Sequence, residues 1–196
     1  MKPDKKGSIC IIFGLVLTVS AFLLVACNNI IQFKASKASE SIFEKIVPLK
    51  ASAEEIPDYM NNQDTIMPTA TVNGYDCIGA LEISSLNIKL PVLSEWNYPS
   101  LRVSPCRYTG SVYKNNLIIC AHNYKNHFGK LKTLKIGDSV AFTDINGNTF
   151  RYKVSDIENV KPNDSENMTA GDWDLTLFTC TVGGTSRVTV RCVREA

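Results

Sequence analysis

The sequence predicts a mainly β domain, an antiparallel barrel or sandwich with little helix, that follows one transmembrane helix. Residues 8–27 carry no charge, and from residue 75 onward short apolar runs alternate with turn residues. Helical periodicity is nearly absent there, apart from a turn near residues 128–135. The predicted strands are residues 77–83, 86–92, 116–122, 139–143, 149–159, 174–181 and 186–193. With 44% hydrophobic and 20% charged residues, the composition is typical of a single globular domain.

The charge distribution excludes nucleic acid as a partner. The net charge of +2 is accounted for by three lysines and one aspartate among the first six residues. The remainder of the chain is therefore neutral, whereas a nucleic-acid-binding protein is expected to present a basic face.

The uncharged run at residues 8–27 is long enough to cross a membrane, because 20 helical residues span roughly 30 Å. The preceding lysines predict a cytoplasmic tail over residues 1–7 and an extracellular remainder. A cleaved signal peptide is one alternative, although its apolar region is usually shorter. Residues 24–27 (LVAC) also resemble the lipobox of bacterial lipoproteins, in which Cys27 would carry a lipid. All three readings place the rest of the chain outside the cell.

Residues 28–74 are predicted to form an extracellular stalk, and residues 75–196 the main folded domain. Within the stalk, residues 35–47 predict a short helix that Pro48 ends. The apolar side of that helix is Ile42, Phe43, Ile46 and Val47. In the second region, the turn residues at 144–147 (DING) between two alternating runs predict a hairpin.

Five cysteines follow Cys27, and an odd number in an exported domain leaves at least one thiol unpaired unless it pairs between chains. They are Cys77, Cys106, Cys120, Cys180 and Cys192. A buried, inert thiol is the default expectation for most of them. A free thiol at a strand end, such as Cys180, is a candidate nucleophile.

The chain contains only two histidines, and they occur in different settings. His122 ends the apolar run 117–121, where a strand opens onto a loop and a side chain can meet substrate. His127 lies in a polar loop and is expected to be a solvated surface residue.

The turn after Cys180 predicts which arginine lies beside the thiol. If Gly183 and Gly184 form a two-residue turn, Cys180 and Arg187 are directly opposed, on one face of neighbouring strands. The same register places Arg191 about 13 Å farther along the strand. The sequence therefore favours Arg187 as the partner of Cys180.

Cys180, His122 and Arg187 form a coherent set for acyl transfer. The thiolate is the nucleophile and the imidazole can protonate a leaving amine. A fixed guanidinium can stabilise the thiolate and the oxyanion of a tetrahedral intermediate.

Two motifs resemble the sortase family. TLFTCT at residues 176–181, followed by RVTVR at 187–191, is similar to the sortase active-site signature, and AHN at 121–123 with FGKL at 128–131 is similar to the sortase histidine loop. The resemblance implies a closed eight-stranded β-barrel with short helices in a membrane-anchored transpeptidase. It implies that Cys180 is the nucleophile, His122 the general acid and base, and Arg187 the oxyanion and substrate stabiliser.

The resemblance further implies weaker contributions to substrate or oxyanion binding from Thr179 and Thr181, and a specificity loop at about residues 155–173. The expected substrates are surface proteins with a C-terminal sorting signal, such as Leu-Pro-x-Thr-Gly. The expected acceptor is an amine of a cell-wall peptidoglycan precursor or another amine.

Two alternatives to transpeptidation remain open. A cysteine peptidase or wall hydrolase would use Cys180 and His122 with water as the acceptor. A metal- or ligand-binding surface module would use Cys120, His122 and His127 as potential zinc ligands, although zinc usually needs a fourth. The sequence favours the enzyme, with neither a metal nor another cofactor.

Overall fold

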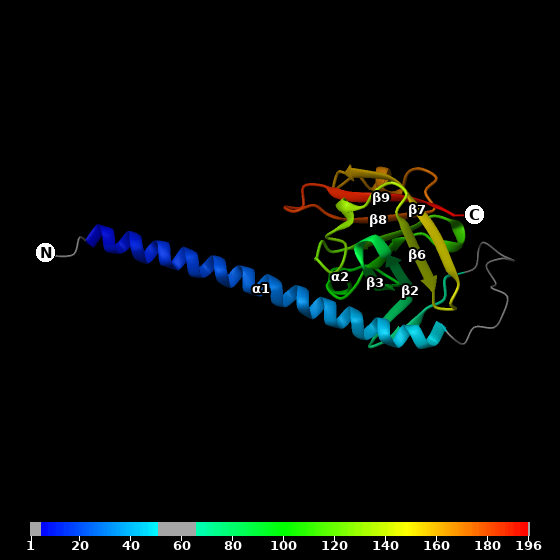
Figure 1. Cartoon of the computed structure of the whole chain (residues 1–196), viewed down its shortest axis with the longest axis horizontal. Helices are drawn as coiled ribbons and strands as arrows, with labels where there is room; N and C mark the ends of the chain where they lie inside the picture. Colours follow the sequence, from blue (N-terminus) through cyan, green and yellow to red (C-terminus); the bar gives the residue numbers. More distant parts are fainter. Residues whose placement is uncertain (1–4, 51–65, 196) are drawn as a thin grey trace. The chain divides into compact units, whose positions relative to one another are not determined.

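The computed structural model describes residues 5–50 and 66–195, and in these ranges nine strands form one sheet (Figure 1). The elements are α1 (Lys5–Lys50), β1 (Ala70–Val72), β2 (Tyr75–Ile83), β3 (Ile88–Leu93), α2 (Tyr98–Leu101), β4 (Cys106–Thr109), β5 (Leu117–Ala121), β6 (Ser139–Asp144), β7 (Thr149–Val160), α3 (Ser165–Thr169), β8 (Leu175–Cys180) and β9 (Arg187–Arg194), with single 3-10 turns at Ser84–Leu86, Val112–Lys114 and Leu131–Thr133.

The sheet closes into an eight-stranded barrel, because β2 and β6 pair with each other as well as with their other neighbours. The strand order is β1-β2-β3-β4-β5-β8-β9-β7-β6, so β1 is a short addition outside the ring. The predicted eight-stranded barrel is confirmed. The expectation of a purely antiparallel sheet is wrong, since β3 pairs with β4 and β5 with β8 in parallel.

Closure depends on Gly79 in β2, where the register with β3 shifts between Cys77 and Gly79. A Cβ atom at position 79 would lie 2.2 Å from the carbonyl oxygen of Thr143 on β6. Only a glycine allows the two backbones to approach this closely. The side chains inside the ring form one large apolar core that includes Leu81, Phe142 and Tyr152.

The predicted hairpin at residues 144–147 is present between β6 and β7. Asp144 is buried there, and its carboxylate accepts hydrogen bonds from the Asn148 backbone N–H at 2.8 Å and from the Tyr113 hydroxyl at 2.8 Å. Strands β1 and β4 were not predicted. Each has only three or four residues, which is too short to show a period of two.

The first part of α1, residues 5–34, forms a compact unit separate from residues 35–196. Its large apolar side chains are exposed, including those of Ile12, Phe22 and Leu24. In the described residues one helix, Gly7–Ile46, has the length and composition of a membrane span, with a mean hydropathy of 2.8 in its most apolar window.

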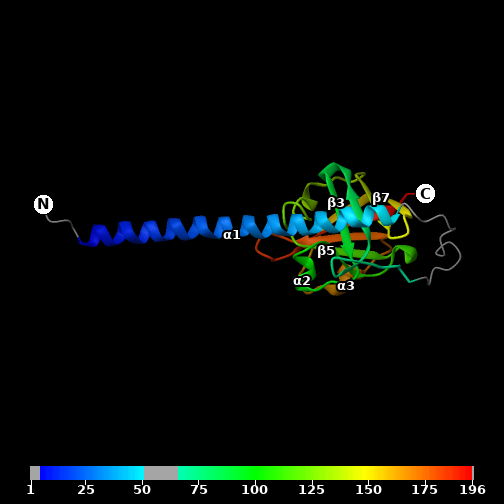
Figure 2. The ribbon, with the colours of Figure 1, turned by 90° about the horizontal axis from the view of Figure 1, so that it is seen from below.

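The second part of α1 packs on the outside of the barrel. Ala35, Ser39, Ile42 and Ile46 are buried, at the spacing of one helix face. Ile42 and Ile46 join a second apolar cluster with residues of β2 to β5. Figure 2 shows this part of α1, in cyan, lying across β3.

The packing of residues 35–46 differs from the stalk that the sequence predicts over residues 28–74. The compact unit begins at Ala35, and β1 pairs with β2 at residues 70–72. The expectation that Pro48 ends the helix is also wrong, because α1 continues to Lys50. A proline in the last turn removes one backbone hydrogen bond, which costs little at a helix end whose neighbouring turns are fixed by packing.

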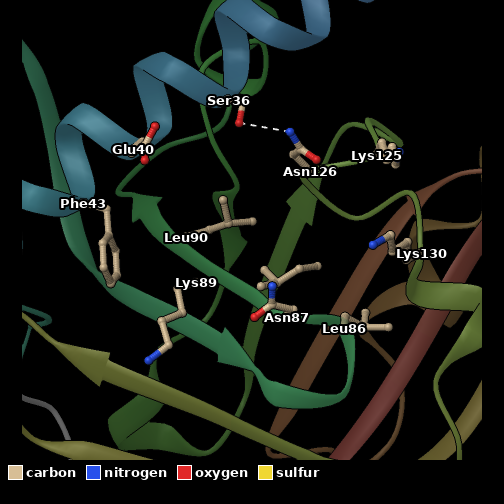
Figure 3. Close-up of a pocket in the computed structure, with 11 residues that line it drawn as sticks. Ser36, Glu40, Phe43, Leu86, Asn87, Lys89, Leu90, Lys125, Asn126 and Lys130 are labelled. Atoms are coloured by element: carbon tan, nitrogen blue, oxygen red, sulfur yellow. Dashed lines mark hydrogen bonds between the residues drawn. The ribbon is translucent and has the colours of Figure 1, made fainter.

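A pocket of about 320 Å³ lies between α1, β3 and the loop after β5 (Figure 3). The Asn126 side-chain amide donates a hydrogen bond to Ser36 Oγ at 3.0 Å across its edge. The loop that follows His122 is therefore attached directly to α1.

Candidate active site

Three neighbouring strands bring His122, Cys180 and Arg187 together. Strand β5 runs parallel to β8 with Ala121 paired to Thr179, so the next residues, His122 and Cys180, are adjacent on one face. Strand β9 begins at Arg187, which pairs directly with Cys180. All three side chains are partly exposed and line one cleft of about 500 Å³.

The turn between β8 and β9 confirms the register predicted from the sequence. Gly183 and Gly184 have φ angles of +85° and +72°, a conformation that favours glycine. Cys180 pairs with Arg187, and Thr176 pairs with Arg191. The turn thus places the guanidinium of Arg187, not that of Arg191, beside the thiol.

The two arginines have different environments. Arg187 lines the cleft, and its only described hydrogen bonds are long ones, 3.4 Å, to the carbonyls of Gly184 and Ser186. Arg191 is 2% exposed and ion-pairs with Glu158 at 2.8 Å. It also donates to the backbone carbonyls of Asn167 at 2.5 Å and Met168 at 2.8 Å. Arg187 is therefore free to contact a substrate, whereas Arg191 holds α3 against the barrel.

Thr179 and Thr181 have different positions. Thr179 is buried at the base of the cleft, and its hydroxyl donates to the carbonyl of Ala121 at 2.8 Å. This bond joins β8 to β5 one residue before Cys180 and His122. The hydroxyl of Thr181 instead donates to the carbonyl of Ser186 at 3.1 Å, inside the β8–β9 turn. Thr181 is not among the residues that line the cleft.

The cleft has one aromatic wall and one polar wall. The aromatic wall contains Trp96 and Tyr108, with ring centroids 5.7 Å apart, and Phe178, 5.3 Å from Tyr108. The polar wall is formed by residues 161–165 together with Met168 of α3. This wall lies within the predicted specificity loop, residues 155–173. The aromatic residues were not predicted, because Trp96 lies in a loop and Tyr108 in the short strand β4.

His122 lies in an environment that disfavours its charged form. Burial lowers the pKa of His122 below its ordinary value, and the positive charge of Arg102 lowers this pKa further. Its ring packs against that of Tyr124, with centroids 4.8 Å apart. An aromatic face beside an imidazole attracts the ring when it is protonated.

The expectation that His127 is solvated is wrong. Its side chain is fully buried, and neither ring nitrogen has a hydrogen-bond partner among the described residues. The loop folds back so that the Phe128 N–H donates to the His122 carbonyl at 3.2 Å and both residues 127 and 128 point inward. Burial and the nearby His122 lower the pKa of His127 to about 4, so it is neutral at pH 7.

The four other cysteines beyond Cys27 are buried, and burial makes their thiols unreactive. Burial raises the pKa of Cys77, Cys120 and Cys192 to about 12, and that of Cys106 above its ordinary value as well. Cys180 is the partly exposed member of the five. Residues 5–50 and 66–195 contain no group of three or more His, Cys, Asp or Glu side chains placed to hold a metal ion.

The arrangement provides the parts of a cysteine acyl-transfer site: a thiol, a proton donor and a fixed cation at the base of a cleft.

Comparisons with known proteins agree with this chemistry. The family model described as the sortase domain matches residues 81–195, more than half of the chain. No curated protein matches the sequence.

Solved structures of sortases have the same fold. Sortase D5 from Clostridium perfringens is 22% identical with a TM-score of 0.58, over 82% of this chain and 97% of that one. Sortase C from Clostridium perfringens is 24% identical with a TM-score of 0.53, over 91% and 98%. Sortase C1 from Streptococcus agalactiae is 23% identical with a TM-score of 0.56, over 84% and 95%. On the match of the family model and this shared barrel, the chain belongs to the sortase family, whose members are cysteine transpeptidases that act on peptide bonds.

Proposed function

We propose that this sortase cleaves a C-terminal sorting signal of the Leu-Pro-x-Thr-Gly type on surface proteins and transfers the new carboxyl end to a cell-wall amine. The observation that carries the proposal is the register of β5, β8 and β9, which brings His122, Cys180 and Arg187 together in the cleft. The cleft of about 500 Å³ with an aromatic wall suits a peptide with apolar side chains.

In the first half-reaction the Cys180 thiolate attacks the scissile carbonyl carbon. The carbonyl π electrons move to oxygen, and Arg187 stabilises the resulting oxyanion. The His122 imidazolium donates its proton to the leaving amine as the C–N bond breaks, which leaves a thioester on Cys180 and a neutral imidazole.

In the second half-reaction an amine attacks the thioester. The neutral His122 accepts the proton of the attacking amine, and the thiolate of Cys180 leaves. Transfer to water by the same steps would make the protein a peptidase or wall hydrolase. The acceptor therefore decides between the two functions.

Transpeptidation is tested with the full chain in detergent and a panel of quenched peptides, including Leu-Pro-x-Thr-Gly and Asn-Pro-type signals. We expect one signal to be cleaved, and added triglycine to convert the acid product into an amide that mass spectrometry detects. A cleaved signal whose product stays entirely acid at millimolar triglycine contradicts transpeptidation to glycyl amines and favours hydrolysis.

We also expect the uncharged helix to remain as an uncleaved anchor, with the tail of residues 1–7 in the cytoplasm and residues 28–196 outside the cell. The apolar side chains of residues 8–27 are exposed, as a bilayer-facing helix requires. Expressed in a bacterial host, the full chain should fractionate with membranes at its unprocessed mass, and Cys27→Ser should behave identically. A chain that lacks residues 1–26 and carries a lipid on Cys27, both lost in Cys27→Ser, would show a lipoprotein instead.

A further inference from the structure

The loop after β5 holds three rings in contact beside the cleft. Tyr124 packs against His122, with centroids 4.8 Å apart, and against His127, with centroids 5.4 Å apart. His122 and Tyr124 are partly exposed, whereas His127 is fully buried. The ring of Tyr124 thus connects the imidazole in the cleft to a second imidazole in the interior.

His127 is connected to the candidate active site through its ring contact with Tyr124. Among the described residues, neither imidazole nitrogen of His127 forms a hydrogen bond. A buried polar side chain without a hydrogen-bond partner is unfavourable for folding, so hydrogen bonding of its nitrogens does not explain its presence. The ring of His127 packs against the ring of Tyr124.

We infer that His127 is a positioning residue for the transpeptidation reaction: its buried ring holds Tyr124 against His122 and thereby fixes the orientation of His122 and favours its protonated form. This inference rests on the role of His122 in the proposed function. Tyr124 acts in the same way, as the middle ring. Neither residue is placed in contact with the reacting atoms.

The contact matters because the surroundings of His122 oppose its charge. Arg102 acts on it with a positive charge. The cleft that His122 lines also contains the basic side chains of Arg187 and Lys161, the carboxyl group of Asp164, the thiols of Cys120 and Cys180, and the phenols of Tyr98 and Tyr108. The neutral His127 contacts Tyr124, the ring neighbour of His122. The aromatic face of Tyr124 opposes these effects, because it attracts a cation within about 6 Å. Loss of that face should leave a smaller imidazolium fraction to protonate the leaving amine.

The backbone of the loop is held independently of the rings. The His127 and Gly129 N–H groups donate to the Tyr124 carbonyl at 2.9 and 3.0 Å, and Asn126 is bonded to Ser36 on α1 (Figure 3). A Cβ atom at Gly129 would lie 2.6 Å from the Asn123 carbonyl oxygen, so the turn is tight. Asn126→Ala removes a contact of the same loop away from the rings and is the matched control.

The experiment measures kcat, KM and the pH profile of peptide cleavage for the full chain with His127→Ala, Tyr124→Leu, both together, His127→Phe and Asn126→Ala. Thermal melting of each variant corrects the rates for the folded fraction. We expect His127→Ala and Tyr124→Leu each to lower kcat about two- to tenfold, the effect of losing one aromatic contact, with KM nearly unchanged. His127→Phe keeps a ring against Tyr124 and should restore kcat to within about twofold of wild type.

Two further results distinguish positioning from a purely structural role. The double variant should lose no more activity than Tyr124→Leu alone, because His127 acts through Tyr124. The active form pairs a thiolate with an imidazolium, and a thiol ordinarily titrates above an imidazole, so the imidazole pKa sets the acidic limb of kcat/KM. That limb should move to lower pH by about 0.3 to 1 unit, matching the two- to tenfold fall in rate. Asn126→Ala should change neither the limb nor kcat.

The inference is overturned if folded His127→Ala retains wild-type kcat and an unshifted acidic limb, if His127→Phe is as impaired as His127→Ala, or if the two losses add in the double variant. Failure of the role that the proposed function assigns to His122 has a different signature. In that case His122→Ala itself remains active, whatever the result at position 127.

Discussion

Replacing Cys180 with alanine should lower kcat by at least about 10⁴-fold, the largest loss expected at any position. The other thiol that lines the cleft, Cys120, is buried and its pKa is raised to about 12, so it is not expected to form the thioester. Wild-type enzyme incubated with the peptide should gain the mass of the acyl fragment, and Cys180→Ala should not. The melting temperature of the variant should stay close to that of wild type, since Cys180 is partly exposed at a strand end.

Cys77→Ala is the matched control, because Cys77 is fully buried in the second apolar cluster and does not line the cleft. It should lose some stability and keep its activity. Brief treatment of wild type with iodoacetamide should modify Cys180 well before the four buried cysteines, whose pKa values burial raises. Preferential labelling of any of those four, or persistent acyl-enzyme in Cys180→Ala, would mean that the nucleophile is misassigned.

Replacing Arg187 with alanine should lower kcat by about 10²- to 10³-fold while leaving stability unchanged. Within residues 5–50 and 66–195 the guanidinium has two hydrogen bonds to lose, both long at 3.4 Å, so the loss falls on the thiolate and the oxyanion. Arg187→Lys should stay impaired by at least about tenfold, because a flexible ammonium does not reproduce the planar guanidinium fork. Cleavage of the quenched peptide and urea unfolding of each variant measure the two effects.

Arg191→Ala should have the opposite effect: a large loss of stability and a smaller fall in kcat. It leaves Glu158 and two backbone carbonyls of α3 without their buried partner, which should destabilise the fold by about 2–4 kcal/mol. The register alone predicts that Arg191→Ala costs far less activity than Arg187→Ala unless Arg191 holds the substrate; the burial of Arg191 adds a structural role. Because α3 contributes to the polar wall of the cleft, KM should rise in the folded fraction. A larger fall in kcat for Arg191→Ala than for Arg187→Ala would reverse the assignment of the two arginines.

The local features of this protein could be predicted from its sequence, because each is encoded by neighbouring residues. The uncharged run at 8–27 predicts the apolar helix, and the 144–147 turn predicts the β6–β7 hairpin. Gly183 and Gly184 predict the pairing of Cys180 with Arg187. In each case turn chemistry or hydrophobic periodicity specifies the backbone without reference to the rest of the chain.

The tertiary structure decided the features that depend on contacts between distant residues. The parallel pairing of β5 with β8 brings His122 next to Cys180 across 58 positions of sequence, and no local pattern specifies it. The burial of His127, the anchoring role of Arg191 and the packing of residues 35–46 on the barrel all oppose what their polar or linker-like surroundings suggest. These side chains are buried because the fold brings together surfaces that are distant in the sequence, and the free energy of that burial overrides local polarity.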